Sequence, residues 1–325
     1  MIVTQTPLRI SFVGGGTDFR GFYETGYGSV VSTAIDKFVY VIIKERFDRF
    51  IRVGYSRTEM VESIDEVQHD LVREALQLVG VEQGLEIATM ADIPSEGSGL
   101  GSSGTVLVGI LHALHIYKGD TVTAEQLAQE ACHIELDILK RPIGKQDQYI
   151  AAYGGLRHFE FCSNEQVEVS TIQLNERDLW QLNESLLLFY TGVTRKSADV
   201  LAEQTMNIPN RMEVLTAMRN QGDELAGHLR RGKIIELGPM LQRNWQRKKQ
   251  LASGVSNTAI DSLYDRAMRS GASGCKIAGA GGGGFLLVCV PPRKRNAVRE
   301  ELSELRELPI TLARDGSKVI FNMRR

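Results

Sequence analysis

The sequence predicts a two-domain protein of the α+β class, with a strand-rich N-terminal part and a mainly helical C-terminal part. The chain has 325 residues, more than one hydrophobic core usually accommodates, so two packed domains are expected. Runs of β-branched and aromatic residues dominate the beginning of the chain, whereas long helical stretches follow residue 180. We therefore predict domains at residues 1–180 and 181–325, with a ligand-binding cleft between them.

The elements of the first domain follow from the spacing of apolar residues. Residues 8–13 alternate toward a glycine turn, and residues 28–46 carry β-rich runs, so both are predicted as strands of one sheet. Residues 69–78 have helical apolar spacing, and residues 84–91 predict another strand. Residues 105–117 are apolar on nearly every face, which indicates a helix buried in the interior.

The remaining elements continue across the predicted boundary. Thr123 is the expected N-cap of a helix that runs to about Leu139, because its hydroxyl can accept a hydrogen bond from the first helical turn. In chain order we then expect a hairpin at 156–161 and 167–174, a strand at 185–190, helical stretches at 195–232 and 234–253, a helix at 260–270, a strand at 285–290, a helix at 293–307 and two closing strands around residues 315 and 316.

The composition excludes several classes of function. A formal net charge of −2 argues against nucleic acid as a partner, because sequence-independent binding to nucleic acid needs a basic surface. No apolar run approaches the ~20 residues of a membrane span, and the N-terminus lacks a basic segment followed by an apolar one. The four cysteines are scattered, as expected for buried thiols in a reducing compartment. A cytoplasmic protein without a membrane partner is therefore expected.

A glycine-serine loop at residues 97–104 opens the apolar helix. Its glycines let the backbone approach a ligand, and the free N–H groups of a helix N-terminus attract anions, phosphate above all. The loop lacks the Gly-Lys-Ser/Thr ending of a Walker A motif. It predicts a phosphate site, and the alternative is a tight strand-to-helix connection without a ligand.

A second segment, residues 7–18, reads Pro-Leu-Arg-Ile-Ser-Phe-Val-Gly-Gly-Gly-Thr-Asp. A strand that delivers Arg9, a flexible turn and then Asp18 would present a carboxylate to sugar hydroxyl groups beside a fixed positive charge. The alternative makes Asp18 a turn cap and Arg9 a surface residue on an edge strand.

A third segment, residues 276–285, has four consecutive glycines before an apolar strand. Such a run costs backbone entropy, and close approach to a ligand or to another loop is the usual compensation. The segment either contacts a ligand or supports the phosphate loop without touching the nucleotide.

Taken together and in this order, the three segments resemble the three motifs of the GHMP kinase superfamily, which includes galactokinase, homoserine kinase, mevalonate kinase and phosphomevalonate kinase. The resemblance spans essentially the whole chain. Residues 7–18, the run Pro-Ile-Gly-Lys-Gln-Asp-Gln-Tyr at 142–149 and Leu-Phe-Tyr-Thr-Gly at 188–192 are similar to the branch of sugar kinases that phosphorylates D-glycero-D-manno-heptose 7-phosphate. Galactokinases carry Gly-Glu-His-Thr-Asp where this chain has Gly-Gly-Gly-Thr-Asp, which argues against galactose as the acceptor.

The resemblance implies an N-terminal domain like ribosomal protein S5 domain 2, a ferredoxin-like C-terminal domain, and catalysis between them. It implies Asp147 as the catalytic base and Arg9 as its cationic neighbour, with ATP and Mg²⁺ as cofactors. The other implied site residues fall into three groups: Gly97, Ser98, Gly99, Leu100, Gly101, Ser102 and Ser103 for the ATP phosphates; Gly15, Gly16, Thr17, Asp18, Gly281 and Gly282 for the substrate; and Ser102 with Glu135 for the metal.

The C-terminal part contains two clusters of basic residues. Arg195 and Lys196 are candidates to bind the phosphate already on the substrate, although a solvated helix start explains the pair almost as well. The run Arg243, Arg247, Lys248 and Lys249 is predicted to be an exposed helix face.

The predicted reaction is transfer of the γ-phosphoryl group of ATP to the anomeric hydroxyl of a phosphorylated heptose, for nucleotide-activated heptose and surface polysaccharide. The partner is a small sugar phosphate, and the protein is expected as a monomer or homodimer. A kinase for another sugar, such as fucose or galactose, is an alternative, because the phosphate loop says little about the acceptor. A non-catalytic sugar-binding regulator is a second one, but Arg9, Glu135 and Asp147 argue against it. A Rossmann-type oxidoreductase fails because no helix-opening G-x-G-x-x-G is present.

Overall fold

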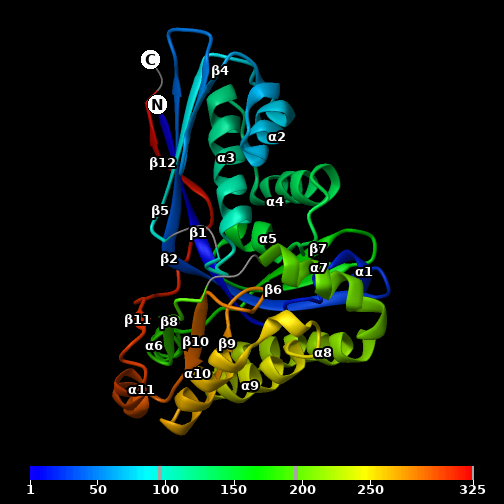
Figure 1. Ribbon diagram of the computed structural model, residues 1–325, viewed down its shortest axis with the longest axis vertical. Coiled ribbons are helices and arrows are strands. Elements are labelled where there is room, and N and C mark those ends of the chain that lie inside the picture. Colours follow the sequence, from blue (N-terminus) through cyan, green and yellow to red (C-terminus); the bar gives the residue numbers. More distant parts are fainter. Residues whose placement is uncertain (94–96, 194–196, 324–325) are drawn as a thin grey trace.

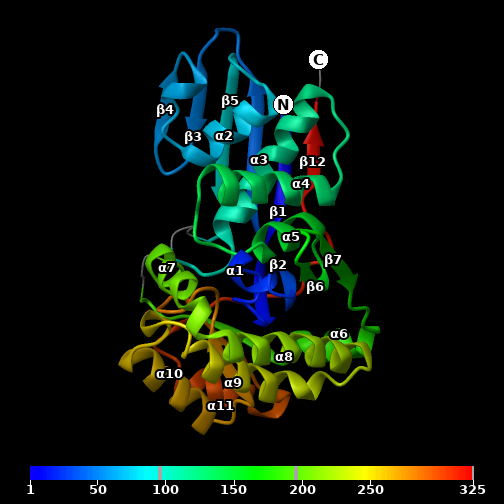
Figure 2. The ribbon, with the colours of Figure 1, turned by 90° about the vertical axis from the view of Figure 1, so that its right-hand side faces the viewer.

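The computed structural model describes residues 1–93, 97–193 and 197–323, which form two α+β layers stacked along the long axis of the molecule (Figures 1 and 2). Each layer contains one sheet. The predicted α+β arrangement of two domains is therefore found.

The first sheet has eight strands and is organised around one long strand, β2 (Tyr27–Glu45). One half of β2 lies between β1 (Ile2–Val13) and β5 (Leu85–Ala91), and its beginning pairs with β6. The strand order is β12-β1-β2-β5-β3-β4, and β7 pairs with β6 at the other end. The other strands of this sheet are β3 (Ile51–Gly54), β4 (Thr58–Val61), β6 (Leu156–Cys162), β7 (Val167–Thr171) and β12 (Lys318–Asn322).

The central helix α3 (Ser102–Lys118) packs against β1, β2 and the helices beside it. Most of its residues are buried, which explains why its sequence is apolar on nearly every face. Thr123 caps the next helix as predicted, because its Oγ1 accepts a hydrogen bond from the backbone N–H of Gln126. The helices of this layer are α1 (Arg20–Tyr23), α2 (Asp70–Val79), α3, α4 (Ala124–Cys132), a π-helical turn (His133–Ile138) and α5 (Gln146–Tyr153).

The second sheet is antiparallel, in the order β11-β8-β10-β9. Phe189, Trp245 and Leu286 belong to the core between this sheet and its helices. Its strands are β8 (Leu186–Tyr190), β9 (Gly274–Ile277), β10 (Phe285–Cys289) and β11 (Arg306–Glu307), and the helices are α6 (Glu176–Glu184), α7 (Ser197–Asn207), α8 (Met212–Arg230), α9 (Leu237–Lys248), α10 (Thr258–Arg269) and α11 (Arg295–Glu301).

The predicted helical stretch at 195–232 is divided into α7 and α8. Pro209 lies in the short 3-10 turn between them, where proline suits the turn but removes the hydrogen-bond donor that a continuous helix needs. The predicted helix at 293–307 is also too long, because α11 ends at Glu301 and residues 306 and 307 pair with β8.

The predicted domain boundaries differ from the structure at both ends of the C-terminal part. Residue 180 lies inside α6 rather than between elements. The last strand, β12, pairs with β1, so the end of the chain belongs to the first sheet and not to a domain at 181–325. An antiparallel partner satisfies the outer backbone groups at the beginning of β1, from Ile2 to Gln5, which would otherwise form an open sheet edge.

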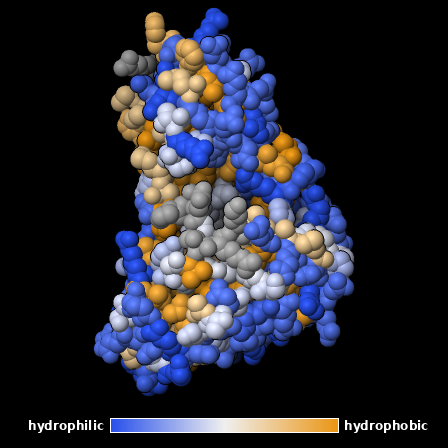
Figure 3. Space-filling model, in the orientation of Figure 1, coloured by the Kyte–Doolittle hydropathy of each residue, from blue (hydrophilic) through white to orange (hydrophobic). Residues whose placement is uncertain are grey.

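On the face seen in Figure 3 hydrophilic residues cover most of the surface, and apolar residues gather along the side of the first sheet. The exposed apolar residues of the first sheet include Met90 of β5 and Ile320 of β12. None of the helices in the described part of the chain is long and apolar enough to cross a membrane.

Candidate active site

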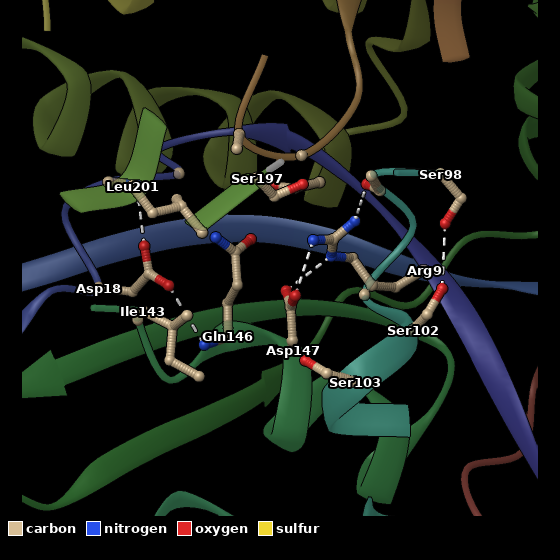
Figure 4. Close-up of a pocket in the computed structure, with 18 of the residues that line it drawn as sticks. Arg9, Asp18, Ser98, Ser102, Ser103, Ile143, Gln146, Asp147, Ser197 and Leu201 are labelled. Atoms are coloured by element: carbon tan, nitrogen blue, oxygen red, sulfur yellow. Dashed lines mark hydrogen bonds and ion pairs between the residues drawn. The ribbon is translucent and has the colours of Figure 1, made fainter. Parts of the chain in front are cut away.

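A cleft of about 800 Å³ lies between the two layers. The first layer contributes β1, the turn after it, the glycine-serine loop and the start of α5. The second contributes α7, the end of α9, and β9 with the glycine run after it. Figure 4 shows the charged and polar side chains of both layers around this space.

Arg9 and Asp147 form a bidentate ion pair in the cleft. The Arg9 Nε lies 2.7 Å from Asp147 Oδ1, and its Nη2 lies 2.8 Å from Oδ2. The remaining Nη1 donates a hydrogen bond of 2.6 Å to the carbonyl of Gly99. Arg9 is buried on an internal strand, which rules out the alternative of a surface residue on an edge strand. Because two parallel N–H···O bonds fix the plane of the carboxylate, Asp147 is held in one orientation at the start of α5.

The glycine-serine loop wraps around this ion pair. Gly99 and Gly101 both have positive φ angles, +71° and +80°, so only glycine adopts these conformations without strain. A Cβ atom on Gly101 would lie 3.0 Å from Arg9 Cγ, which is closer than an ordinary van der Waals contact. The hydroxyls of Ser98 and Ser102 lie 3.0 Å apart at the start of α3. The loop therefore presents a helix N-terminus to the cleft, as expected for a phosphate site.

Of the predicted phosphate-binding residues, all but one line the cleft: Gly97, Ser98, Gly99, Gly101, Ser102 and Ser103. Leu100 is the exception. It is fully buried in the main core, and its carbonyl accepts a hydrogen bond of 3.0 Å from the backbone N–H of Arg9. It anchors the loop to β1 rather than facing a ligand.

The second glycine run packs backbone to backbone against the glycine-serine loop. A Cβ atom on Gly279 would lie 2.6 Å from the carbonyl oxygen of Gly99, and one on Gly284 would lie 2.6 Å from that of Ser98. Gly279 also lines the cleft, whereas the predicted substrate residues Gly281 and Gly282 do not. Both pack against Val255, and Gly282 donates a hydrogen bond of 2.8 Å to its carbonyl. The glycine run therefore packs against the glycine-serine loop and supports it. Because Gly281 and Gly282 do not line the cleft, this supporting role is favoured over direct contact with the substrate.

The turn at Gly15–Asp18 forms the opposite end of the cleft. Gly15, Gly16 and Asp18 line it, but Thr17 is buried, and its hydroxyl donates to the carbonyl of Gly14 at 2.8 Å. Thr17 thus shapes the turn instead of facing the cleft.

Asp18 is almost completely buried beside this turn. Its Oδ1 accepts a bond of 2.8 Å from the N–H of Gly16, and its Oδ2 one of 3.2 Å from the N–H of Gln146. Burial raises the pKa of the Asp18 carboxyl, against the lowering effect of the Gly16 hydrogen bond.

The predicted metal pair is not assembled. Ser102 lines the cleft, but Glu135 is fully buried and does not. The Oε1 of Glu135 accepts a bond of 2.9 Å from Arg141 Nη1, and its Oε2 one of 2.5 Å from Gln148 Nε2. Burial raises the pKa of Glu135, opposed by the Arg141 charge and by hydrogen bonds that include one from Ser103. The arrangement around Glu135 does not fit a magnesium ion, and within the described ranges no group of three or more His, Cys, Asp or Glu side chains could hold a metal.

Lys248 lines the cleft, although its basic run was predicted to be exposed. Its side chain is buried, and its Nζ donates to the carbonyl of Gly15 at 3.2 Å and to Gln204 Oε1 at 3.1 Å. Burial lowers the pKa of Lys248 to about 8, against the attraction of Asp18. The sequence spacing could have predicted this burial, because Lys248 lies three residues after the buried Trp245 and seven after Leu241, on the same face of the helix.

Lys276, on β9, is a second buried lysine in the cleft wall. Its Nζ donates to the carbonyls of Ser11 and Phe12, at 3.0 and 3.2 Å, and so ties the second layer to β1. Burial lowers its pKa to about 7, and the nearby charges of Lys248 and Arg9 act in the same direction. Arg195 and Lys196, the predicted phosphate ligands, lie outside the described residues.

Comparison with known proteins agrees with this geometry. The model "GHMP kinases N terminal domain" matches residues 65–155, and "GHMP kinases C terminal" matches residues 225–307; together they cover more than half of the chain. These matches identify the chain as a phosphotransferase with an alcohol group as acceptor. The chain belongs to the GHMP kinase family, which confirms the predicted two-domain fold.

Several relatives cover nearly the whole chain. The D-glycero-alpha-D-manno-heptose 7-phosphate kinase of Campylobacter jejuni is 27% identical over 95% of this chain and 96% of its own length. The L-fucokinase/L-fucose-1-P guanylyltransferase of Bacteroides fragilis is also 27% identical, over 92% of this chain but only 36% of that longer protein. A D-glycero-D-manno-heptose 1-phosphate kinase structure from Bacteroides thetaiotaomicron superposes over all of both chains with a TM-score of 0.83 at 23% identity, a likeness of fold.

Proposed function

We propose that this chain transfers the γ-phosphoryl group of ATP to the anomeric O1 hydroxyl of D-glycero-D-manno-heptose 7-phosphate. The product would be the 1,7-bisphosphate, for the synthesis of nucleotide-activated heptose and surface polysaccharide. The observation that carries the proposal is the Arg9–Asp147 ion pair, held between the glycine-serine loop and the Asp18 turn. The heptose 7-phosphate kinase among the relatives supports this choice of acceptor.

In the proposed reaction Asp147 accepts the proton of the attacking hydroxyl. The O–H bond of the sugar breaks as its oxygen bonds to the γ-phosphorus, and the bond from that phosphorus to the bridging oxygen of ADP breaks. Arg9 keeps the carboxylate oriented and offsets negative charge on the transferring group. The N-terminus of α3 and the Ser98 and Ser102 hydroxyls would bind the nucleotide phosphates.

We propose ATP with Mg²⁺ as the nucleotide form, as is general for kinases. Ser102 is the one predicted metal ligand that lines the cleft. Glu135 is buried and hydrogen-bonded to Arg141 and Gln148, and no step is assigned to the metal. We further propose a cytoplasmic protein that acts as a monomer or homodimer on a small sugar phosphate.

The test is ADP release with ATP and Mg²⁺ across D-glycero-D-manno-heptose 7-phosphate, mannose 6-phosphate, mannose, galactose and fucose. We expect the highest kcat/KM with the heptose phosphate. A preference for fucose would favour the second candidate, a fucokinase, which the Bacteroides fragilis relative supports. Turnover of none of these sugars would contradict a sugar kinase.

A further inference from the structure

The cleft has two halves on either side of Asp147. Ser98 and Ser102 lie on one side of it, and Asp18, Ile143, Gln146 and Leu201 lie on the other (Figure 4). The Ser98 side carries the helix N-terminus and is suited to phosphates. We name the other side the acceptor half, defined by Gly15, Gly16, Asp18, Ile143, Gln146 and Lys248.

Gln146 brings an unsatisfied amide to the acceptor half. Its backbone N–H bonds to Asp18, but its buried side-chain Oε1 has no partner among the described residues. A Cβ on Gly15 would lie 3.3 Å from the Gln146 Nε2 and 3.4 Å from Ser11 Oγ, so both polar groups face the same glycine. The hydroxyl of Ser11 has no partner in the described chain either. Because a buried polar atom without a partner costs about 1–3 kcal/mol, such a group in a ligand cleft indicates a partner on the ligand.

Lys248 adds a charged donor on the same side. Two of its three N–H groups are accounted for by Gly15 and Gln204, which leaves one for a ligand. Asp18 and Asp147 both attract its charge. A second phosphate placed here would face these two carboxylates, whereas a hydroxyl group would accept from Lys248 without this repulsion.

We propose that Gln146 and Lys248 are specificity-determining residues that recognise hydroxyl groups of the acceptor next to the hydroxyl that is phosphorylated. The inference rests on the proposed function and adds residues to its acceptor site. It also implies that a phosphate already on the acceptor lies outside the acceptor half.

The experiment combines enzyme variants with altered acceptors. D-glycero-D-manno-heptose 7-phosphate is compared with its 2-deoxy and 3-deoxy analogues in the parent, Gln146→Leu and Lys248→Met. We expect the parent to lose roughly 10- to 100-fold in kcat/KM on at least one analogue, because a site group is then left without its partner. The variant that lacks the partner of the missing hydroxyl should lose a similar factor in kcat/KM on the full sugar, and it should no longer distinguish the full sugar from that analogue. Its KM for ATP should stay within about 3-fold of the parental value, because only acceptor contacts are lost.

Lys276→Met is the matched control, because it also removes a buried lysine from the cleft wall, but one whose Nζ donates to backbone carbonyls of β1. It should lower thermal stability and leave the ratio between full and deoxy sugars unchanged. If the parent turns over the heptose phosphate and both test variants keep the parental ratio, the inference is wrong and the proposed function stands. If the parent phosphorylates no sugar, both are overturned.

Discussion

At the scale of single residues, Asp147 combines a fixed orientation with access to the cleft. Arg9 occupies both of its oxygens, yet the Asp147 side chain remains 26% exposed, against 5% for Arg9. A fixed and partly accessible carboxylate can accept a proton without first reorganising, which is what a general base requires. The pairing with a buried arginine therefore suits the role proposed for Asp147 and also joins α5 to β1.

The variant Asp147→Asn tests this role. The amide keeps the shape of the side chain but cannot take up the proton, so we expect kcat to fall roughly 10²-fold or more, with smaller changes in KM. Asp137→Asn is the control, since it changes the same residue type in an ion pair with Arg20, and neither residue lines the cleft. Steady-state rates of the two variants, measured together, show whether Asp147 acts as the proton acceptor. Turnover of Asp147→Asn within a few-fold of the parent would show that another group accepts the proton.

The acceptor contact proposed for Lys248 predicts that use of the acceptor depends on pH. Burial lowers its pKa to about 8; Asp18 and Asp147 oppose this effect, and Arg9 adds to it. Below that pH the ammonium is charged and binds the acceptor most strongly, and above it the charge is lost. We therefore expect kcat/KM for the acceptor, which reports pKa values of the free enzyme, to decline above about pH 8.

Lys248→Arg separates this effect from other titrations. A guanidinium stays charged throughout the range, so the alkaline decline should move to higher pH even if the overall rate is lower. The measurement is kcat/KM at acceptor concentrations below KM from pH 6 to 10. An unchanged decline in the arginine variant would assign the titration to another group, with Lys276 the first to examine because its pKa is lowered to about 7.

At the scale of elements, the two glycine-rich segments act as one unit. Their backbones approach too closely for any side chain at Gly279, so the position of the phosphate loop depends on a segment far along the chain. Gly279→Ala should force the loops apart, raising the KM for ATP several-fold and lowering the thermal midpoint.

Gly80→Ala is the matched control for this variant. Gly80 has φ +71°, almost the same as the +70° of Gly279, but no atom lies within 4 Å of an added Cβ. It should therefore show only the conformational cost of about 1 kcal/mol. Titration of initial rates with ATP and thermal unfolding compare the two. Equal effects would mean that strain at a positive φ, and not loop contact, explains the Gly279 variant.

The sequence was sufficient for elements whose pattern is local. The helix at 105–117 was recognisable because it is apolar all round, and the Thr123 cap because it precedes the apolar spacing. The glycine-serine loop was predicted from its glycines and the helix that follows, the catalytic roles of Arg9 and Asp147 came from motif resemblance, and the structure brings all three together. Lys248 was missed because its run of basic neighbours concealed its place on the buried face of α9. The partners of Glu135 depend on side-chain packing between α3, α5 and the π-helical turn, which no local pattern encodes.

At the scale of the whole molecule, the end of the chain closes the first layer. The segment before β12 crosses the end of α5, where a Cβ on Gly154 would lie 2.1 Å from the carbonyl carbon of Asp315, and one on Gly316 2.0 Å from the carbonyl oxygen of Ala152. The hydroxyl of Ser317 then lies 2.8 Å from that of Thr6 on β1. The two elements that carry Asp147 and Arg9 are thus held by the last residues of the chain.

Deletion of residues 317–325 tests this dependence. It removes the strand paired with the beginning of β1, so we expect a thermal midpoint lower by several degrees, at ~2–4 °C per kcal/mol for a domain of this size, and a reduced kcat. Deletion of residues 324 and 325 alone, beyond β12, is the control and should match the parent.

Because the longer deletion could prevent folding altogether, Gly316→Ala provides a milder change. The Cβ of the new alanine has no room against Ala152 and should displace α5. We expect kcat to change by a larger factor than the KM for either substrate. Parental stability and kcat in both altered chains would show that β12 and its connection merely cover the sheet edge and that α3 alone keeps Arg9 and Asp147 in register.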